Sequence, residues 1–148
     1  KDVIKKKFRT TWSPRPGIDS IRQITISSGH EWFNSQTAGS LETRENDFYF
    51  GVDFESGDIL AFRGQNNYEL LTKPFQVHPT VALPIGGYNF KDYMLRVRTY
   101  DGRRASGELE VEGGTYYNGR KLTISTDGEI NINKHFQNCR IIIFKWHL

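Results

Sequence analysis

A regular alternation of apolar and polar side chains over residues 47–55 constrains the fold of this chain more than any other feature. Phe48, Phe50, Val52 and Phe54 share one parity, whereas two aspartates, a tyrosine, a glycine and a glutamate share the other. Successive side chains of a β-strand point to opposite faces of the sheet. The segment is therefore predicted to be a strand with one apolar and one mostly polar face.

The same alternation returns in the second half of the chain. Residues 93–99 and 108–112 each place their apolar side chains on one parity and their charged side chains on the other. Several such strands predict a sheet that separates two different environments. The charges that we expect on its polar face are Arg96, Arg98, Glu108, Glu110 and Glu112.

Composition limits the class of protein. The 148 residues are enough for one domain with a core. Mean hydropathy is −0.60, and no apolar stretch approaches the ~20 residues of a membrane-spanning helix. Membrane β-barrels remain possible on this evidence, because their alternating strands are half polar. The 14% of aromatic residues fits either a barrel or a sheet that binds sugars.

The charge pattern argues against a nucleic-acid partner. Net charge is +3, and outside the lysines at 5–7 the basic residues are scattered among acidic ones. We interpret residues 5–7 as a solvated terminus. A single cysteine, Cys139, excludes an internal disulfide and fits a reducing compartment or a cysteine-poor bacterial envelope protein. Because the sequence has neither an initiating methionine nor a signal peptide, we expect a mature form or a piece of a longer protein.

Turn signals divide the chain into seven predicted strands with almost no helical periodicity. We expect strands at 5–12, 18–33, 39–55, 58–70, 88–100, 104–117 and 120–126, and an irregular proline-rich loop at 72–87. Connections near Pro14, Ser56 and Gly102 should lie at one end of the sheet and the others at the opposite end. The predicted fold is all-β: an antiparallel up-and-down meander of about seven to eight strands over residues 1–126, forming a barrel or part of a larger barrel. For residues 127–148 we keep two interpretations, an extra strand or an atypical tail.

The hairpin at residues 93–111 has a predicted register. A reversal centred on Gly102 places Leu95 opposite Leu109 and Arg96 opposite Glu108. Leu95 opposite a glutamate would contradict the two-faced sheet.

Three ordered motifs carry a resemblance to a known family. Residues 69–77 followed by 81–88 resemble the pattern E-L-x-x-P-F-x-I … V-x-I-P-x-G-x-Y. Residues 99–106 followed by 114–120 resemble T-x-x-x-R-x-x-S … G-x-F-Y-x-G-x-R, and residues 12–17 resemble W-x-x-R-P-G. Together they resemble the C-terminal outer-membrane β-barrel region of bacterial proteins classed as domain of unknown function 5916, which often carry a carbohydrate-binding family 9-like domain. The resemblance ends after Ser125, and it implies no catalytic residues.

The residues themselves offer little chemistry. The oxygens of residues 53–58 lack the spacing of a calcium loop, so a hairpin turn is the favoured interpretation. Glu108, Glu110 and Glu112 are better explained as a water-facing wall than as acid–base residues. His135 and Cys139 are too few ligands for a metal site. We therefore predict no enzymatic activity, no catalytic residues, no metal site and no cofactor.

Aromatic residues toward the predicted strand ends are the remaining candidates. They could form membrane-interface girdles, stack on sugar rings or fill a sandwich core. These residues are Trp12, Trp32, Tyr93, Tyr116 and Tyr117.

We expect a non-enzymatic element of a bacterial outer-membrane barrel, with a channel, transport or envelope-assembly role and outer-membrane lipid as its partner. The alternative is a soluble β-sandwich, periplasmic or secreted, that binds carbohydrate. The apolar parity should face outward in a barrel and inward in a sandwich. No oligomeric state is predicted.

Overall fold

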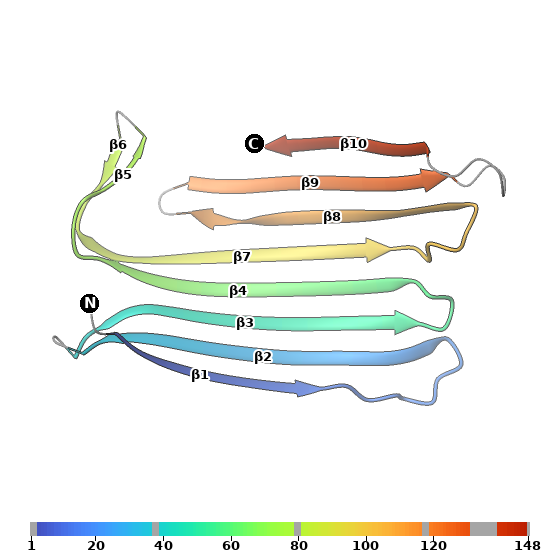
Figure 1. The fold of residues 1–148 in the computed structure, drawn as a ribbon, viewed down its shortest axis with the longest axis horizontal. Helices are drawn as coiled ribbons and strands as arrows, with labels where there is room; N and C mark the ends of the chain where they lie inside the picture. The colour runs from blue at the N-terminus through green and yellow to red at the C-terminus, as the bar shows by residue number, and fades with distance from the viewer. Residues whose placement is uncertain (1–2, 37–38, 79–80, 117–118, 131–138, 148) are drawn as a thin grey trace.

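The computed structural model describes residues 3–36, 39–78, 81–116, 119–130 and 139–147, most of which form one antiparallel sheet (Figure 1). Its eight strands lie in the order β1-β2-β3-β4-β7-β8-β9-β10. They are β1 (Val3–Trp12), β2 (Ile21–Ser35), β3 (Leu41–Phe54), β4 (Ile59–Leu71), β7 (Gly86–Arg98), β8 (Ala105–Tyr116), β9 (Gly119–Ile130) and β10 (Cys139–His147). Two short strands, β5 (Phe75–His78) and β6 (Val81–Leu83), pair only with each other.

The predicted all-β antiparallel meander is confirmed. The described part of the chain contains no helix, and neighbouring strands of the large sheet follow one another along the sequence apart from the β5–β6 hairpin. Connections after β1, β3 and β7 lie at one end of the sheet, and those after β2, β4 and β8 lie at the other, as expected (Figure 1).

The sheet is open. Strands β1 and β10 form its two edges, and no described strand joins them into a barrel. Strand β10 pairs with β9, so the C-terminal segment supplies an eighth strand. Strand β9 also continues to Ile130, beyond the end that we predicted at residue 126.

The prediction of an irregular loop at residues 72–87 is wrong in part. This stretch contains the β5–β6 hairpin and the start of β7, where Gly86 and Gly87 pair with Leu71 and Leu70. Pro74 and Pro84 lie just outside the paired residues of the hairpin. Prolines that flank a ladder remove no hydrogen bond from it, so they do not prevent a short hairpin.

The strand registers assign each side chain to one of two faces. One row runs Ile26, Phe50, Phe62, Leu95, Val111, Ile124 across the six strands from β2 to β9. We call the face that carries this row the apolar face. The adjacent row on the opposite face, the polar face, runs Thr25, Gly51, Ala61, Arg96, Glu110, Ser125. The predicted separation of apolar residues from Arg96, Arg98 and the glutamates is confirmed.

The exact register that we predicted for β7 and β8 is wrong by two residues. Leu95 lies opposite Val111 and Arg96 opposite Glu110, so the parity holds while the reversal is longer than a tight turn at Gly102. The regular β7–β8 ladder ends at Thr99, where a side chain takes part in the pairing. The Thr99 amide donates to the Gly107 carbonyl at 2.9 Å, and Thr99 Oγ1 accepts from the Gly107 amide at 2.7 Å.

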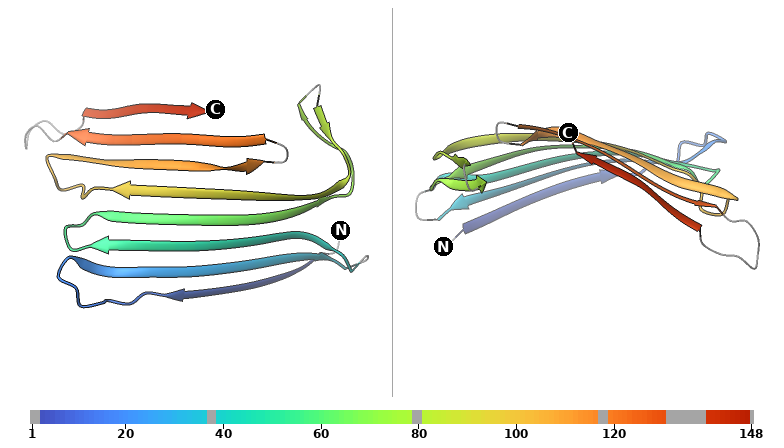
Figure 2. Two further views of the ribbon diagram at one scale, coloured as in Figure 1. Left: turned by 180° about the vertical axis from the view of Figure 1, so that it is seen from behind. Right: turned by 90° about the horizontal axis from the view of Figure 1, so that it is seen from above.

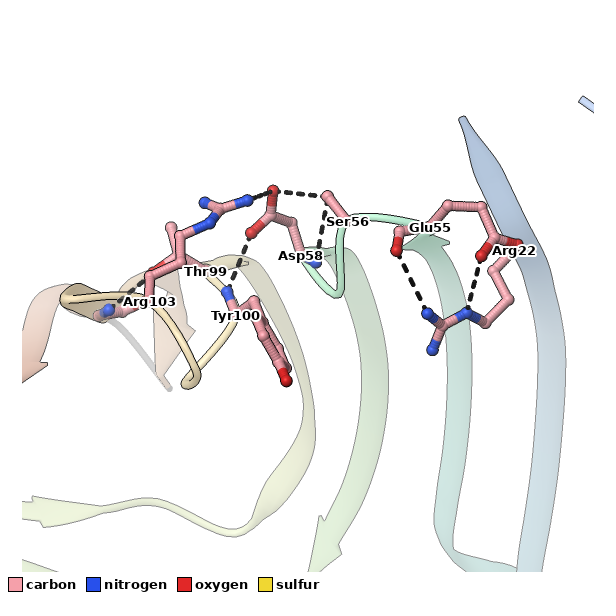
Figure 3. A network of polar contacts seen from close by, with 8 residues as sticks. Arg22, Glu55, Ser56, Asp58, Thr99, Tyr100 and Arg103 are labelled. Atoms are coloured by element: carbon pink, nitrogen blue, oxygen red, sulfur yellow. Dashed lines mark hydrogen bonds and ion pairs between the residues drawn. The ribbon is translucent and has the colours of Figure 1, made fainter. Parts of the chain in front are cut away.

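A carboxylate from the neighbouring turn holds the loop that follows. Asp58 accepts a hydrogen bond from the Tyr100 amide (2.9 Å) and one from Arg103 Nη2 (2.7 Å), as Figure 3 shows. Successive amides of a strand point alternately to its two neighbours, so the Thr99 amide faces Gly107 and the Tyr100 amide faces the β3–β4 turn. The wide loop after β7 is therefore in contact with the β3–β4 turn, which is distant from it in sequence.

The strands form a single curved layer (Figure 2). Within the described residues, no second sheet or helix covers either face. Ala61, Phe90 and Met94 are buried, and all three belong to the polar face. Tyr93 and Leu95, on the apolar face of β7, are 51% and 47% exposed. The buried residues of the large sheet thus lie mostly on the polar face, with Val52 of the apolar face as an exception.

Candidate functional site

The predicted aromatic residues do not form a single row. Trp12 ends β1 on the apolar face and is 63% exposed, and Trp32 lies on the same face near the end of β2. Tyr93 is also on the apolar face, but it lies in the middle of β7, so its expected place toward a strand end is wrong. Tyr116 ends β8. Tyr117 lies outside the described residues.

Part of this aromatic set is organised around a histidine. His30 stacks on Trp32, with ring centroids 5.8 Å apart, and on Phe8, with centroids 6.5 Å apart. Its ring nitrogens lie 2.9 Å from Asn46 Oδ1 and 3.1 Å from Ser28 Oγ. Both nitrogens therefore have partners within the sheet, which fixes the ring plane.

Tyr93 has a different surrounding. Its ring stacks on Phe62 with centroids 6.3 Å apart, and both rings lie beside Gly64. Because Gly64 has no side chain, the rings of Phe62 and Tyr93 lie against the position that its side chain would occupy. The apolar face thus carries exposed aromatic groups at several levels along the strands.

The predicted polar-face charges come together as ion pairs. Arg96 Nη2 donates to Glu110 Oε2 at 2.6 Å, and Arg96 Nε lies 3.3 Å from Glu108 Oε1. Arg98 lies opposite Glu108 and pairs with Asp101 in the following loop. These contacts place an arginine beside each of the three carboxylates Glu108, Glu110 and Asp101.

Glu112 joins a second group on the same face. Lys121 Nζ lies 3.0 Å from Glu112 Oε1 and 3.1 Å from Asp92 Oδ1. One lysine of β9 therefore bridges carboxylates of β8 and β7. The five predicted charges share the polar face, and Lys121 links them to β9.

Sequence reasoning missed the ion pairs at the β1 edge. Glu31 of β2 lies between Lys5 and Lys7 of β1, with Lys5 Nζ 2.8 Å from Glu31 Oε2. Arg9 Nη2 donates to Asp47 Oδ1 of β3 at 2.8 Å. Residues 5–7 are exposed, but they belong to a paired strand, and Lys5 and Lys7 are ion-paired with Glu31. The sequence pattern that could have predicted these ion pairs is the shared parity of Lys5, Lys7 and Arg9, which places them on one face of a strand.

Exposure along β7 differs between its two faces. Tyr93, Leu95 and Val97 of the apolar face are exposed, whereas Met94 of the polar face is buried and Arg96 is half-buried. The most enclosed side chains of the strand are apolar, those of Phe90 and Met94, and the charged side chain of Arg98 is exposed. The apolar face of β7 is therefore the more exposed of the two.

Other kinds of site have no counterpart in the described residues. No group of three or more histidine, cysteine, aspartate or glutamate side chains is arranged to hold a metal ion in that part of the chain. Among the same residues there is no helix long and apolar enough to cross a membrane.

Comparisons with known proteins give no assignment: no protein family, curated protein or solved structure matches this chain.

Proposed function

We propose that this chain is part of the wall of a bacterial outer-membrane β-barrel, with a non-enzymatic channel, transport or envelope-assembly role. In this proposal the apolar face contacts lipid and the polar face lines the interior. The observation that carries the proposal is the two-faced β7, where Leu95 and Val97 are exposed on the apolar face and Arg96 is ion-paired on the polar face. The resemblance of residues 8–120 to the barrel region of the domain of unknown function 5916 family agrees with it.

The exposed apolar area supports a lipid environment. Phe8, Trp12, Phe48, Tyr93, Leu95, Val97, Leu109, Leu122 and Ile124 each expose more than a third of their surface and lie on this one face. A contiguous apolar surface that spans several strands is a mark of a membrane or protein interface. The alternative, a soluble sandwich that binds carbohydrate, requires a second sheet over this face, and no described element occupies that position.

The open edges support a barrel larger than the described sheet. Strands β1 and β10 each have one paired neighbour. Unpaired strand edges do not occur in the hydrocarbon region, because their amide and carbonyl groups would have no partners. In a membrane, these edges must pair with further strands or with each other.

Site-directed spin labelling tests this orientation with two adjacent residues. Ile124→Cys and Ser125→Cys are made in a Cys139→Ser background, labelled with a nitroxide, and placed in lipid vesicles. Ile124 belongs to the apolar face and Ser125 to the polar face of β9. We expect the label at 124 to be accessible to lipid-soluble oxygen and the label at 125 to a water-soluble nickel chelate. Equal access of the nickel chelate to both labels would contradict the proposal.

A further inference from the structure

The two faces of the sheet differ in their charges, because the polar face carries both signs and the apolar face carries mainly cations. In β1 to β4 and β7 to β9, every acidic side chain belongs to the polar face except Glu42, which lies where the β2–β3 register shifts. The apolar face nevertheless carries cations. They are Lys6 of β1, Arg44 of β3, Lys91 of β7 and Arg120 of β9, which we call the cationic belt.

The cationic belt lies at one border of the apolar surface. Lys6, Trp32, Arg44 and Tyr68 occupy one row across β1 to β4, and Lys91 lies on the adjacent row with Asn66 and Asn46. The next row toward the other end contains Phe48, Tyr93 and Leu122, where the apolar residues begin. The face therefore changes from apolar to cationic within two residues on β1, β7 and β9, and within four residues on β3.

The belt cations lack the partners that their counterparts on the polar face have. Lys5, Lys7, Arg9, Arg96 and Lys121 of the polar face all form ion pairs. For Lys6, Arg44, Lys91 and Arg120, the described part of the chain provides no side-chain ion pair. The Arg44 Nε atom is shielded from solvent and has no hydrogen-bond acceptor. The cations of the belt are therefore able to pair with an anion from outside the described chain.

The flanking side chains indicate the kind of anion. Trp32 and Tyr68 lie directly beside Arg44 on either side. Tryptophan and tyrosine favour the level of lipid headgroups, where their apolar and polar parts are both satisfied. Arginine and lysine at the same level attract anionic lipid. A small soluble anion would need the positive charges but would gain nothing from the apolar rows beside them.

We propose that the cationic belt binds the phosphate groups of anionic lipid at one membrane interface, with Arg44 at its centre. This inference rests on the proposed function, because it requires the apolar face to be in contact with lipid. It adds a lipid preference and the position of one headgroup level, between the row of Phe48 and Tyr93 and the row of Trp32 and Tyr68.

Vesicle binding by the whole chain tests the inference. Affinity is measured for vesicles of phosphatidylcholine alone and of phosphatidylcholine with phosphatidylglycerol, with and without inorganic phosphate. We expect tighter binding to the anionic vesicles and no competition by phosphate at millimolar concentration. Arg44→Gln and, separately, Lys91→Gln should each weaken binding to anionic vesicles about fivefold while leaving binding to neutral vesicles unchanged.

Arg63→Gln is the matched control. Arg63 is an exposed arginine on the polar face, for which the described residues offer no ion-pair partner. Its substitution removes the same charge from the opposite face and should have a smaller effect than Arg44→Gln. Circular dichroism establishes that each variant keeps its sheet.

The outcomes separate the two proposals. Equal binding to both kinds of vesicle, or equal losses for Arg44→Gln and Arg63→Gln, would overturn the lipid-phosphate site and leave the membrane function standing. Competition by inorganic phosphate would point to a soluble anion and overturn it as well. Failure to bind vesicles of either composition would overturn both proposals.

Discussion

Arg96 of β7 lies directly opposite Glu110 of β8, and its Nη2 atom donates to Glu110 Oε2 at 2.6 Å. The Thr99 amide donates to the Gly107 carbonyl, so 99 and 107 occupy a hydrogen-bonded position of the ladder, with Thr99 Oγ1 accepting the return bond from the Gly107 amide. Such pairs alternate with non-hydrogen-bonded ones along an antiparallel ladder, so Arg96 and Glu110 form a non-hydrogen-bonded pair with close Cα atoms. This pairing brings both backbone and side chains of the two residues together.

The register gives the first prediction. In the chain in detergent micelles, nuclear Overhauser spectra should contain a strong contact between the Hα atoms of Arg96 and Glu110. The register expected for a reversal centred on Gly102 would instead give the contact between Arg96 and Glu108. Observation of the latter contact would show that the loop does not have the width described above.

Removing the Arg96 charge should destabilise the sheet. Arg96→Gln leaves Glu108 and Glu110 on one face without their shared cation, and the guanidinium is partly exposed. We expect a loss of about 0.5–1 kcal/mol in the free energy of unfolding, measured by urea denaturation in micelles. The control Arg63→Gln removes an exposed arginine of the same face and should change it by less than about 0.5 kcal/mol. Equal effects would mean that the ion pairs of Arg96 contribute nothing specific.

Two adjacent glycines of β8 should respond differently to alanine. A Cβ at Gly114 would collide with the Lys91 carbonyl oxygen and lie 2.9 Å from the Asp92 Cα, which are backbone atoms that cannot rotate away. A Cβ at Gly113 would find its nearest atoms at 3.6 and 3.7 Å, an ordinary contact. We expect Gly114→Ala to lower the free energy of unfolding by about 1–3 kcal/mol and Gly113→Ala to be tolerated. Urea denaturation of the two variants under identical conditions provides the comparison.

The turn network should depend on pH through Asp58. The hydrogen bond from Arg103, followed by those from Ser56 and the Tyr100 amide, lowers the pKa of Asp58 below its ordinary value of 3.8. A carboxyl group with a lowered pKa in the folded state stabilises the fold above its unfolded pKa, and this contribution is lost as pH falls through the folded value. The chemical shift of the Tyr100 amide proton should therefore titrate with a midpoint below 3.8.

Two variants identify the group that titrates. Asp58→Asn should abolish the change at the Tyr100 amide, whereas Asp101→Asn should preserve it. Asp101 lies in the same loop but pairs with Arg98 instead of the Tyr100 amide. A midpoint at or above 3.8 in the unmodified chain would contradict the network drawn in Figure 3.

Sequence alone determined the seven long strands β1 to β4 and β7 to β9, together with their two faces. The alternation at Phe48, Phe50 and Val52 is a local property, because side chains of any strand point alternately to its two sides. It therefore predicted which residues share a face before any partner strand was known. The same alternation predicted correctly that Leu95 does not lie opposite a glutamate of β8, although the predicted register was wrong by two residues.

Tertiary structure decided how those strands meet. The register of Arg96 with Glu110 depends on the loop at Tyr100, which is held by Asp58 from a different turn. Ion pairs such as Lys5 with Glu31 and Lys121 with Asp92 join residues of different strands. The cationic belt likewise appears only when Lys6, Arg44 and Lys91 are aligned across the sheet. A periodic pattern specifies the direction of each side chain, whereas the position of a strand relative to its neighbour depends on contacts between segments that are remote in the chain.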